Sequence, residues 1–167
     1  MYKNEGLNII AEKLKERGKE IDFSDIDDTT PVFQVGALCA RLGIDVIFAK
    51  LTNGLAGYFD HARTIIFVND EYSATRNLFT IAHEIGHYIL HDGTNNRYDE
   101  YHKYNNEERK REYEANDFAG TLLMPEYKFV KIFEQYKGNT KKISDIFGVS
   151  IRACEVRAFN LGLIDNL

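Results

Sequence analysis

The segment FTIAHEIGHYILH, residues 79–91, constrains the fold most because it places two histidines four residues apart in an apolar run. In an α-helix, residues i and i+4 lie one above the other on the same face. His83, Glu84 and His87 then share a narrow polar sector, while apolar side chains occupy the opposite half. The segment therefore predicts a buried helix, running from about residue 73 to 91, whose polar stripe faces a cleft.

Two imidazoles at this spacing can bind one metal ion, and Glu84 lies one step round the helix, beside the metal but not bound to it. The alternative interpretation is that the histidines satisfy hydrogen bonds in the core and that Glu84 pairs with a cation. A zinc hydrolase uses three protein ligands, so the metal interpretation requires a third ligand from elsewhere. Leu90 and Gly93 occupy the glycine and histidine positions of the HExxHxxGxxH class, which excludes that class.

A second segment, REYEANDFAGTLLMP (111–125), offers two glutamates for this role, Glu112 and Glu114. They are two residues apart in a predicted helix, so both cannot face the same site. In helical projection Glu112 lies closer to the apolar face and beside Asn116, which is then placed to hydrogen-bond a metal-binding histidine. We therefore expect Glu112 to be the ligand, and Glu114 to contribute local stability or orientation. The ExxAN pattern also resembles the glutamate helix of thermolysin-like zinc proteases.

Three segments in one order, FTIAHEIGH, EYEANDFAGTLLMP and ISDIFGVSIRACEVRAFNLGLI, resemble the ImmA/IrrE family of zinc metallopeptidases over about residues 44–163. The resemblance implies a small zincin-like α+β fold with a helical C-terminal part. Carried over to matching positions, it implies that His83, His87 and Glu112 bind Zn²⁺ and that Glu84 is the catalytic residue. Glu84 would take a proton from the attacking water and pass it to the leaving amine.

The same resemblance implies a cytoplasmic enzyme that cleaves or inactivates a helix-turn-helix (XRE-type) repressor or an antitoxin. Such proteins are often encoded in phages, mobile elements, toxin-antitoxin loci or stress-response systems. One residue departs from the thermolysin-like pattern: Asn116 stands where an aspartate usually orients a zinc histidine. Asparagine is familiar in the ImmA/IrrE family, but it is uncharged and supports the histidine more weakly.

The remaining elements are predicted from periodicity and turn residues. Helices are expected at 4–18, from Pro31 to about Leu42, and from Asn105 or Asn106 to before Pro125. Segments 44–51, 55–61 and 63–69 are rich in β-branched and aromatic residues, which predicts a short antiparallel meander. Its edge, within residues 55–69, is a candidate for binding an extended substrate by strand addition, although ordinary sheet residues explain each position equally well. We divide the chain into a catalytic domain, 1–125, and a helical extension packed on it, 126–167.

The C-terminal segment has the layout of a helix-turn-helix, with a helix, a glycine stop at Gly148, a cap at Ser150 and a second helix. Between residues 137 and 157, five basic residues stand against two acidic ones, which is a modest excess for DNA binding. An apolar αα-hairpin packed on the catalytic part explains the same residues, and we favour it over direct DNA binding.

Composition excludes several classes of partner and location. The net charge of −5 gives no overall attraction to nucleic acid. No apolar run approaches the roughly 20 residues of a membrane span, and the N-terminus lacks the apolar core of a signal peptide, so we expect a soluble, cytoplasmic protein without a membrane partner. Cys39 and Cys154 form no CxxC pair and are expected to be buried thiols.

Several polar residues remain without a firm role. His91 lies about 12 Å along the axis from His83, too far to join the same metal, and we expect it to be structural. His61, in a turn, is expected to be solvated. Residues 93–105 read as a lid or a disordered connector. A second oxyanion donor could come from this loop, but the sequence does not rank its candidates, which are Tyr98, Tyr101, His102 and Tyr104.

Three functions remain open. The first is a site-specific metallopeptidase that acts on a regulatory protein. The second is a non-proteolytic regulator that keeps zinc for structure, against which the intact Glu84 argues because a structural site needs no base. The third is a DNA-binding regulator that uses the C-terminal segment.

Overall fold

The computed structural model describes residues 1–91, 96–98 and 104–167. In these ranges seven helices and four strands follow one another along the chain. The helices are α1 (Glu5–Glu16), α2 (Pro31–Leu42), α3 (Ala74–Leu90), α4 (Asn106–Leu123), α5 (Glu126–Gln135), α6 (Thr140–Phe147) and α7 (Ile151–Asn160). The strands are β1 (Asp45–Ala49), β2 (Leu55–Asp60), β3 (Ile65–Asn69) and β4 (Asn96–Tyr98). The α+β class predicted from the sequence is confirmed.

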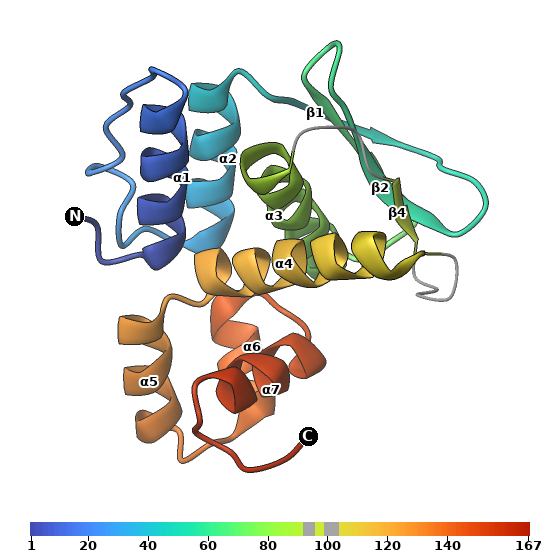
Figure 1. Cartoon of the computed structure of the whole chain (residues 1–167). Coiled ribbons are helices and arrows are strands. Elements are labelled where there is room, and N and C mark those ends of the chain that lie inside the picture. Colours follow the sequence, from blue (N-terminus) through green and yellow to red (C-terminus); the bar gives the residue numbers. More distant parts are fainter. Residues whose placement is uncertain (92–95, 99–103) are drawn as a thin grey trace.

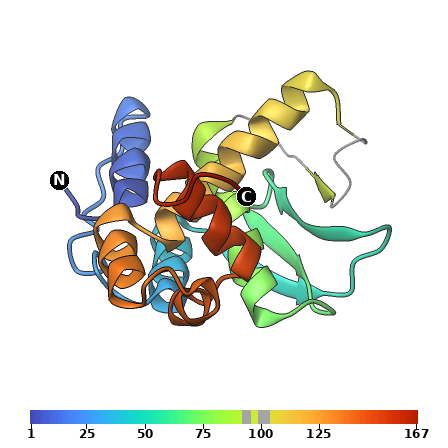
Figure 2. The ribbon, with the colours of Figure 1, turned by 90° about the horizontal axis from the view of Figure 1, so that it is seen from below.

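Helix α3 occupies the centre of the arrangement (Figure 1). It packs on β2 and β3 on one side and contacts α1, α2 and α4 on the others. The helices α5, α6 and α7 lie beyond α4, and the view from below shows them as a separate layer in front of the rest (Figure 2). The polar stripe of α3 is therefore enclosed by other elements instead of facing open solvent.

Helix boundaries follow the capping residues in the sequence. The Ser73 side chain accepts a hydrogen bond from the Arg76 backbone N–H at the start of α3. At the start of α4, Asn105 and Glu108 form a reciprocal capping box, which confirms the predicted start of this helix. Gly43 ends α2 at a left-handed φ of 69°, which glycine adopts without steric cost.

The strand order corrects the predicted meander. The sheet runs β1-β3-β2-β4, and β1 pairs parallel to β3, whereas β2 pairs antiparallel to both β3 and β4. The Asn53–Gly54 turn does form, with φ of 60° and 69°, but it leads into β2 from a non-strand segment instead of joining β1 to β2 in a hairpin. A tight turn fixes the local chain direction, whereas packing of distant segments decides which strands pair.

The prediction that residues 55–69 contain an edge of the sheet, able to bind a substrate strand, is also wrong. Strand β3 lies between β1 and β2, and β2 pairs with β4 from Leu55 to Tyr58. Residues 55–69 therefore lie mostly inside the sheet, because their backbone groups are already paired. Among the described residues, the outer strands are β1 and β4.

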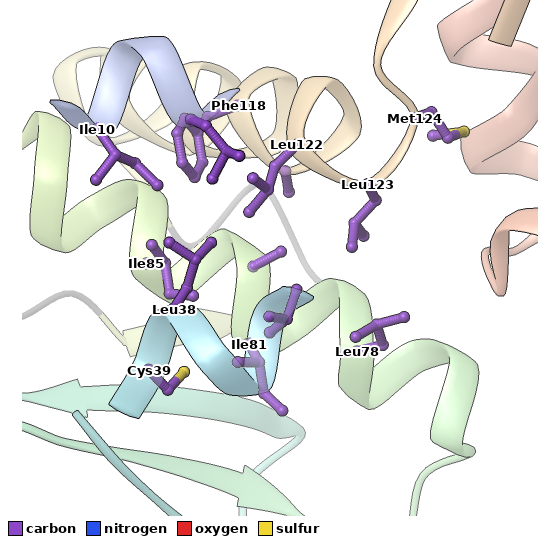
Figure 3. Packing of buried hydrophobic residues seen from close by; sticks show 14 of the residues in the cluster. Ile10, Leu38, Cys39, Leu78, Ile81, Ile85, Phe118, Leu122, Leu123 and Met124 are labelled. Atoms are coloured by element: carbon purple, nitrogen blue, oxygen red, sulfur yellow. The ribbon is translucent and has the colours of Figure 1, made fainter. Parts of the chain in front are cut away.

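The core joins all parts of the fold. Figure 3 shows side chains from α1, α2, α3 and α4 meeting in one cluster, among them Ile10, Leu38, Ile85 and Leu122. Cys39 and Cys154 are buried free thiols, as expected. No helix in the described ranges is both long enough and apolar enough to cross a bilayer.

The C-terminal helices α6 and α7, here the C-terminal hairpin, pack on α4 as expected, and the preference for an αα-hairpin over direct DNA binding stays a prediction. Helices α6 and α7 contact each other, and α7 contacts α4. The buried Arg157 of α7 donates a hydrogen bond from Nε to the Met124 backbone carbonyl (2.9 Å) at the end of α4. The hairpin is thus tied to the end of α4 by a hydrogen bond as well as by apolar contacts. The division into domains at residue 125 stays a prediction.

Candidate metal centre

The site forms where α4 crosses α3, and a glycine permits the close approach of the two helices. A Cβ atom added at Gly86 would lie 2.9 Å from Cδ1 of Phe118 and 3.3 Å from Cα of Ala115. Real Cβ atoms rarely come so close, so a side chain at this position would push α4 away. Gly86 lies inside the HEIGH motif, between Glu84 and His87. The motif therefore supplies both the polar stripe and the contact that brings α4 to it.

The structure brings together the three side chains that the sequence nominated as ligands. One ligand atom each from His83, His87 and Glu112 lies within 4.8 Å of the others, and all three residues are buried. Glu112 Oε2 lies 3.0 Å from His83 Nε2, and Glu112 Oε1 lies 2.8 Å from His87 Nε2. The two Nε2 atoms are 3.0 Å apart. This group can hold a metal ion.

The donor set fits a divalent cation with open coordination. Two imidazole nitrogens and a carboxylate are the three protein ligands of one class of catalytic zinc site. Two nitrogen lone pairs and a carboxylate that converge in a buried space repel one another unless positive charge lies between them. Burial alone would raise the pKa of Glu112, but the neighbouring imidazoles of His83 and His87 outweigh it and lower that pKa to about 2. Glu112 is therefore an anion at neutral pH.

Glu84 lies on α3 directly after His83, and its side chain is fully buried. It is not a member of the group that can hold the metal. The sequence assigned it a separate role for the same reason, because the next residue round a helix points about 100° away. A general base in metal-assisted hydrolysis is a carboxylate that lies next to the metal ligands without binding the metal, and Glu84 directly follows the ligand candidate His83.

Asn116 orients His83. The Asn116 Oδ1 atom lies 2.7 Å from His83 Nδ1. An amide oxygen only accepts, so His83 donates from Nδ1 and directs its unprotonated Nε2 toward Glu112. The expectation that Asn116 hydrogen-bonds a histidine of the site agrees with this contact.

The surroundings of His87 contain contacts that the sequence analysis did not specify. His87 Nδ1 lies 3.0 Å from His91 Nδ1, and His91 Nε2 lies 2.8 Å from Glu114 Oε2. Burial lowers the pKa of His91, although its hydrogen bond to Glu114 acts in the opposite direction. The spacing of His87 and His91, again four residues, was the signal that could have found this contact.

Of the other candidates, His61 and Tyr104 lie within the described residues. His61 is exposed at the β2–β3 turn, as expected, where its ring contacts Phe59 and Tyr88. The side chain of Tyr98, and all of Tyr101 and His102, lie outside the described residues. Much of the expected lid, 93–105, also lies there. Tyr104 is described and directly precedes the cap of α4. The second oxyanion donor stays without an assignment.

A pocket of about 620 Å³ lies between α3, α4 and α7, and none of His83, Glu84, His87 and Glu112 lines it. Asn116, which contacts His83, forms part of its wall. Its apolar lining includes Phe79 and Val156, and its charged lining consists of Arg76, Arg152, Arg157 and Asp117. The C-terminal hairpin thus supplies one wall of this pocket.

Comparison with known protein families assigns the sequence to one of them. The sequence model of the IrrE N-terminal-like domain, a peptidase family, matches residues 39–159. Among solved structures, a Mycobacterium tuberculosis transcriptional regulator has a similar fold, with a TM-score of 0.58 and 19% sequence identity. The match covers 90% of this chain but 45% of that protein, so this chain spans less than half of its length. No curated protein matches the sequence.

Proposed function

Because the chain belongs to the family of the IrrE N-terminal-like domain, a peptidase family, we propose that it is a zinc-dependent metallopeptidase that cleaves a specific regulatory protein. The observation that carries the proposal is the convergence of His83, His87 and Glu112 beside the buried Glu84. A structural zinc site has no need of an additional buried carboxylate. In this proposal, His83, His87 and Glu112 hold the metal.

Zinc bound by these residues would lower the pKa of a water to about 7 and polarise the peptide carbonyl. The Glu84 carboxylate takes the proton of the attacking water and delivers it to the nitrogen of the leaving amine. Asn116 keeps the His83 proton on Nδ1, so that Nε2 stays free to bind. Burial of the whole group excludes bulk water and strengthens these interactions.

We propose a helix-turn-helix repressor or an antitoxin in the cytoplasm as the substrate. Two observations support a regulatory partner: the ImmA/IrrE resemblance of the motifs, and the fold similarity to a protein named as a transcriptional regulator.

The test compares the zinc-loaded protein with its Glu84→Gln variant in a lysate of the host cell. New protein N-termini should arise with the wild type and be missing with the variant, because the amide cannot accept the proton. Both proteins should contain about one zinc per molecule. Equal sets of new termini would place the chemistry elsewhere.

The second candidate function is a non-proteolytic regulator that binds its partner. It would be favoured if the wild type binds zinc and forms a stable complex with the partner but produces no new termini.

A further inference from the structure

A chain of polar contacts leads from the candidate metal centre to the surface. Glu112 Oε1 contacts His87 Nε2 at 2.8 Å, and His87 Nδ1 contacts His91 Nδ1 at 3.0 Å. His91 Nε2 then contacts Glu114 Oε2 at 2.8 Å. The exposed side-chain fraction rises outward, from 1% for His87 to 8% for His91 and 40% for Glu114. Neither His91 nor Glu114 belongs to the group that can hold the metal.

The outer carboxylate fixes where the protons of this chain lie. An ionised carboxylate only accepts hydrogen bonds, so His91 must donate to Glu114 from Nε2. In the neutral imidazole, Nδ1 of His91 is then the acceptor, and His87 must donate to it from its own Nδ1. This leaves Nε2 of His87 unprotonated, and that nitrogen faces Glu112 and His83. The contacts thus select the one tautomer of His87 that can bind a metal through Nε2.

We propose that His91 and Glu114 are positioning residues that hold His87 in its metal-binding tautomer and orientation. This inference rests on the proposed function, because it assumes that a metal binds at the three-residue group. A carboxylate linked to a ligand histidine increases the basicity of that histidine and restricts its ring. Here the carboxylate acts through a second histidine, from α4 back to the end of α3.

The two halves of the centre are supported differently. His83 is held by one neutral amide, that of Asn116, whereas His87 is held by an imidazole backed by a carboxylate. The two glutamates of α4 thereby have different roles. Glu112 faces the candidate metal centre, and Glu114 contacts His91 at the end of α3, outside the centre.

A purely structural role must be distinguished from this one, because the His91–Glu114 pair also ties the end of α3 to α4. The test measures zinc affinity by competition with a chelator for three variants. His91→Phe keeps the ring volume and removes the acceptor. His91→Asn keeps an oxygen close to the position of Nδ1 but does not reach Glu114. Glu114→Gln keeps the shape of the side chain and removes its charge.

We expect His91→Phe to weaken zinc binding by about 10- to 100-fold, the usual effect of losing a residue that supports a metal ligand. His91→Asn should recover most of this loss, and Glu114→Gln should lie between His91→Asn and His91→Phe. The matched controls are His61→Asn, which changes an exposed histidine, and Glu155→Gln, which changes a carboxylate ion-paired to Arg152 on α7. Both controls should bind zinc as the wild type does.

A second measurement tests the tautomer directly. In the metal-free wild type, ¹⁵N–¹H NMR should show the His87 proton on Nδ1, protected from exchange by the contact with His91. In His91→Phe this protection should be lost.

Two results would overturn the inference while leaving the proposed function intact. One is wild-type zinc affinity in His91→Phe. The other is an equal loss in His91→Phe and His91→Asn that parallels the melting temperature of the metal-free variants, which would indicate a structural tie only. A wild type that binds no zinc would refute the proposed function, and the inference with it.

Discussion

The crossing of α3 and α4 buries ionisable groups among its apolar contacts, whereas the hairpin of α6 and α7 buries mainly apolar side chains. The crossing buries ionisable groups, namely His83, Glu84, His87 and Glu112. The hairpin buries mainly apolar ones, including Ile143, Phe147, Cys154 and Ala158. Burial of ionisable groups costs free energy unless partners compensate it, whereas apolar burial stabilises. Apolar burial in the hairpin therefore stabilises the fold, whereas the buried ionisable groups at the crossing lower the free energy of unfolding.

The largest expected effect concerns the two glutamates of α4. Glu112→Gln should lower zinc affinity by more than about 100-fold, because it removes a ligand and not a supporting residue. Glu114→Gln should keep a stoichiometry near one at saturating zinc. Metal analysis after gel filtration checks both variants. If zinc is lost from Glu114→Gln and kept by Glu112→Gln, the third ligand must be reassigned.

The hairpin should respond in the opposite way. Phe147 is almost fully buried and packs against Phe129, with the ring centroids 5.6 Å apart. Phe147→Ala should lower the free energy of unfolding by about 3–5 kcal/mol without changing the zinc content of the folded protein. Denaturant titration measures the first and metal analysis the second. The neighbouring Ile146, 41% exposed, is the control, and Ile146→Ala should change stability far less.

Gly86 tests whether the geometry of the crossing depends on close approach. Gly86→Ala should cost about 1–3 kcal/mol and weaken zinc binding, because the new methyl group meets Phe118 and Ala115. Gly36, in α2, has no atom within 4 Å of an added Cβ. Gly36→Ala should therefore be neutral or stabilising, since alanine favours a helix. Equal effects of the two substitutions in denaturant titrations would show that the crossing tolerates a wider separation.

The smallest effect concerns thiol reactivity. Burial raises the pKa of both Cys39 and Cys154 to about 11. Since only the thiolate reacts, the folded protein should alkylate slowly at pH 8, and rates should rise as pH approaches 11. Denaturant should expose both thiols. Faster labelling of Cys154 than of Cys39 under native conditions would show that the hairpin opens independently of the α2 side of the core.

Predictions from the sequence were most successful where a single segment carries the signal. Helix α3, its polar stripe and the start of α4 follow from periodicity and capping residues. The helical phase of α4 indicated which glutamate faces the centre, and the structure places Glu112 there and Glu114 outside. The pairing of the strands was not predicted correctly, because turn residues between strands do not specify which strands pair.

The sequence by itself determined the α+β class, the spacing of the two histidines and the glutamate beside them, and a second helix that could supply a third ligand. These features depend on the repeat of one helix, which operates within a few residues. Tertiary structure decided that β1 pairs with β3, that α7 forms a wall of the pocket, and that Glu114 reaches back to His91. Each of these depends on packing between segments far apart in the chain, and packing is set by the fit of whole surfaces and not by any local pattern.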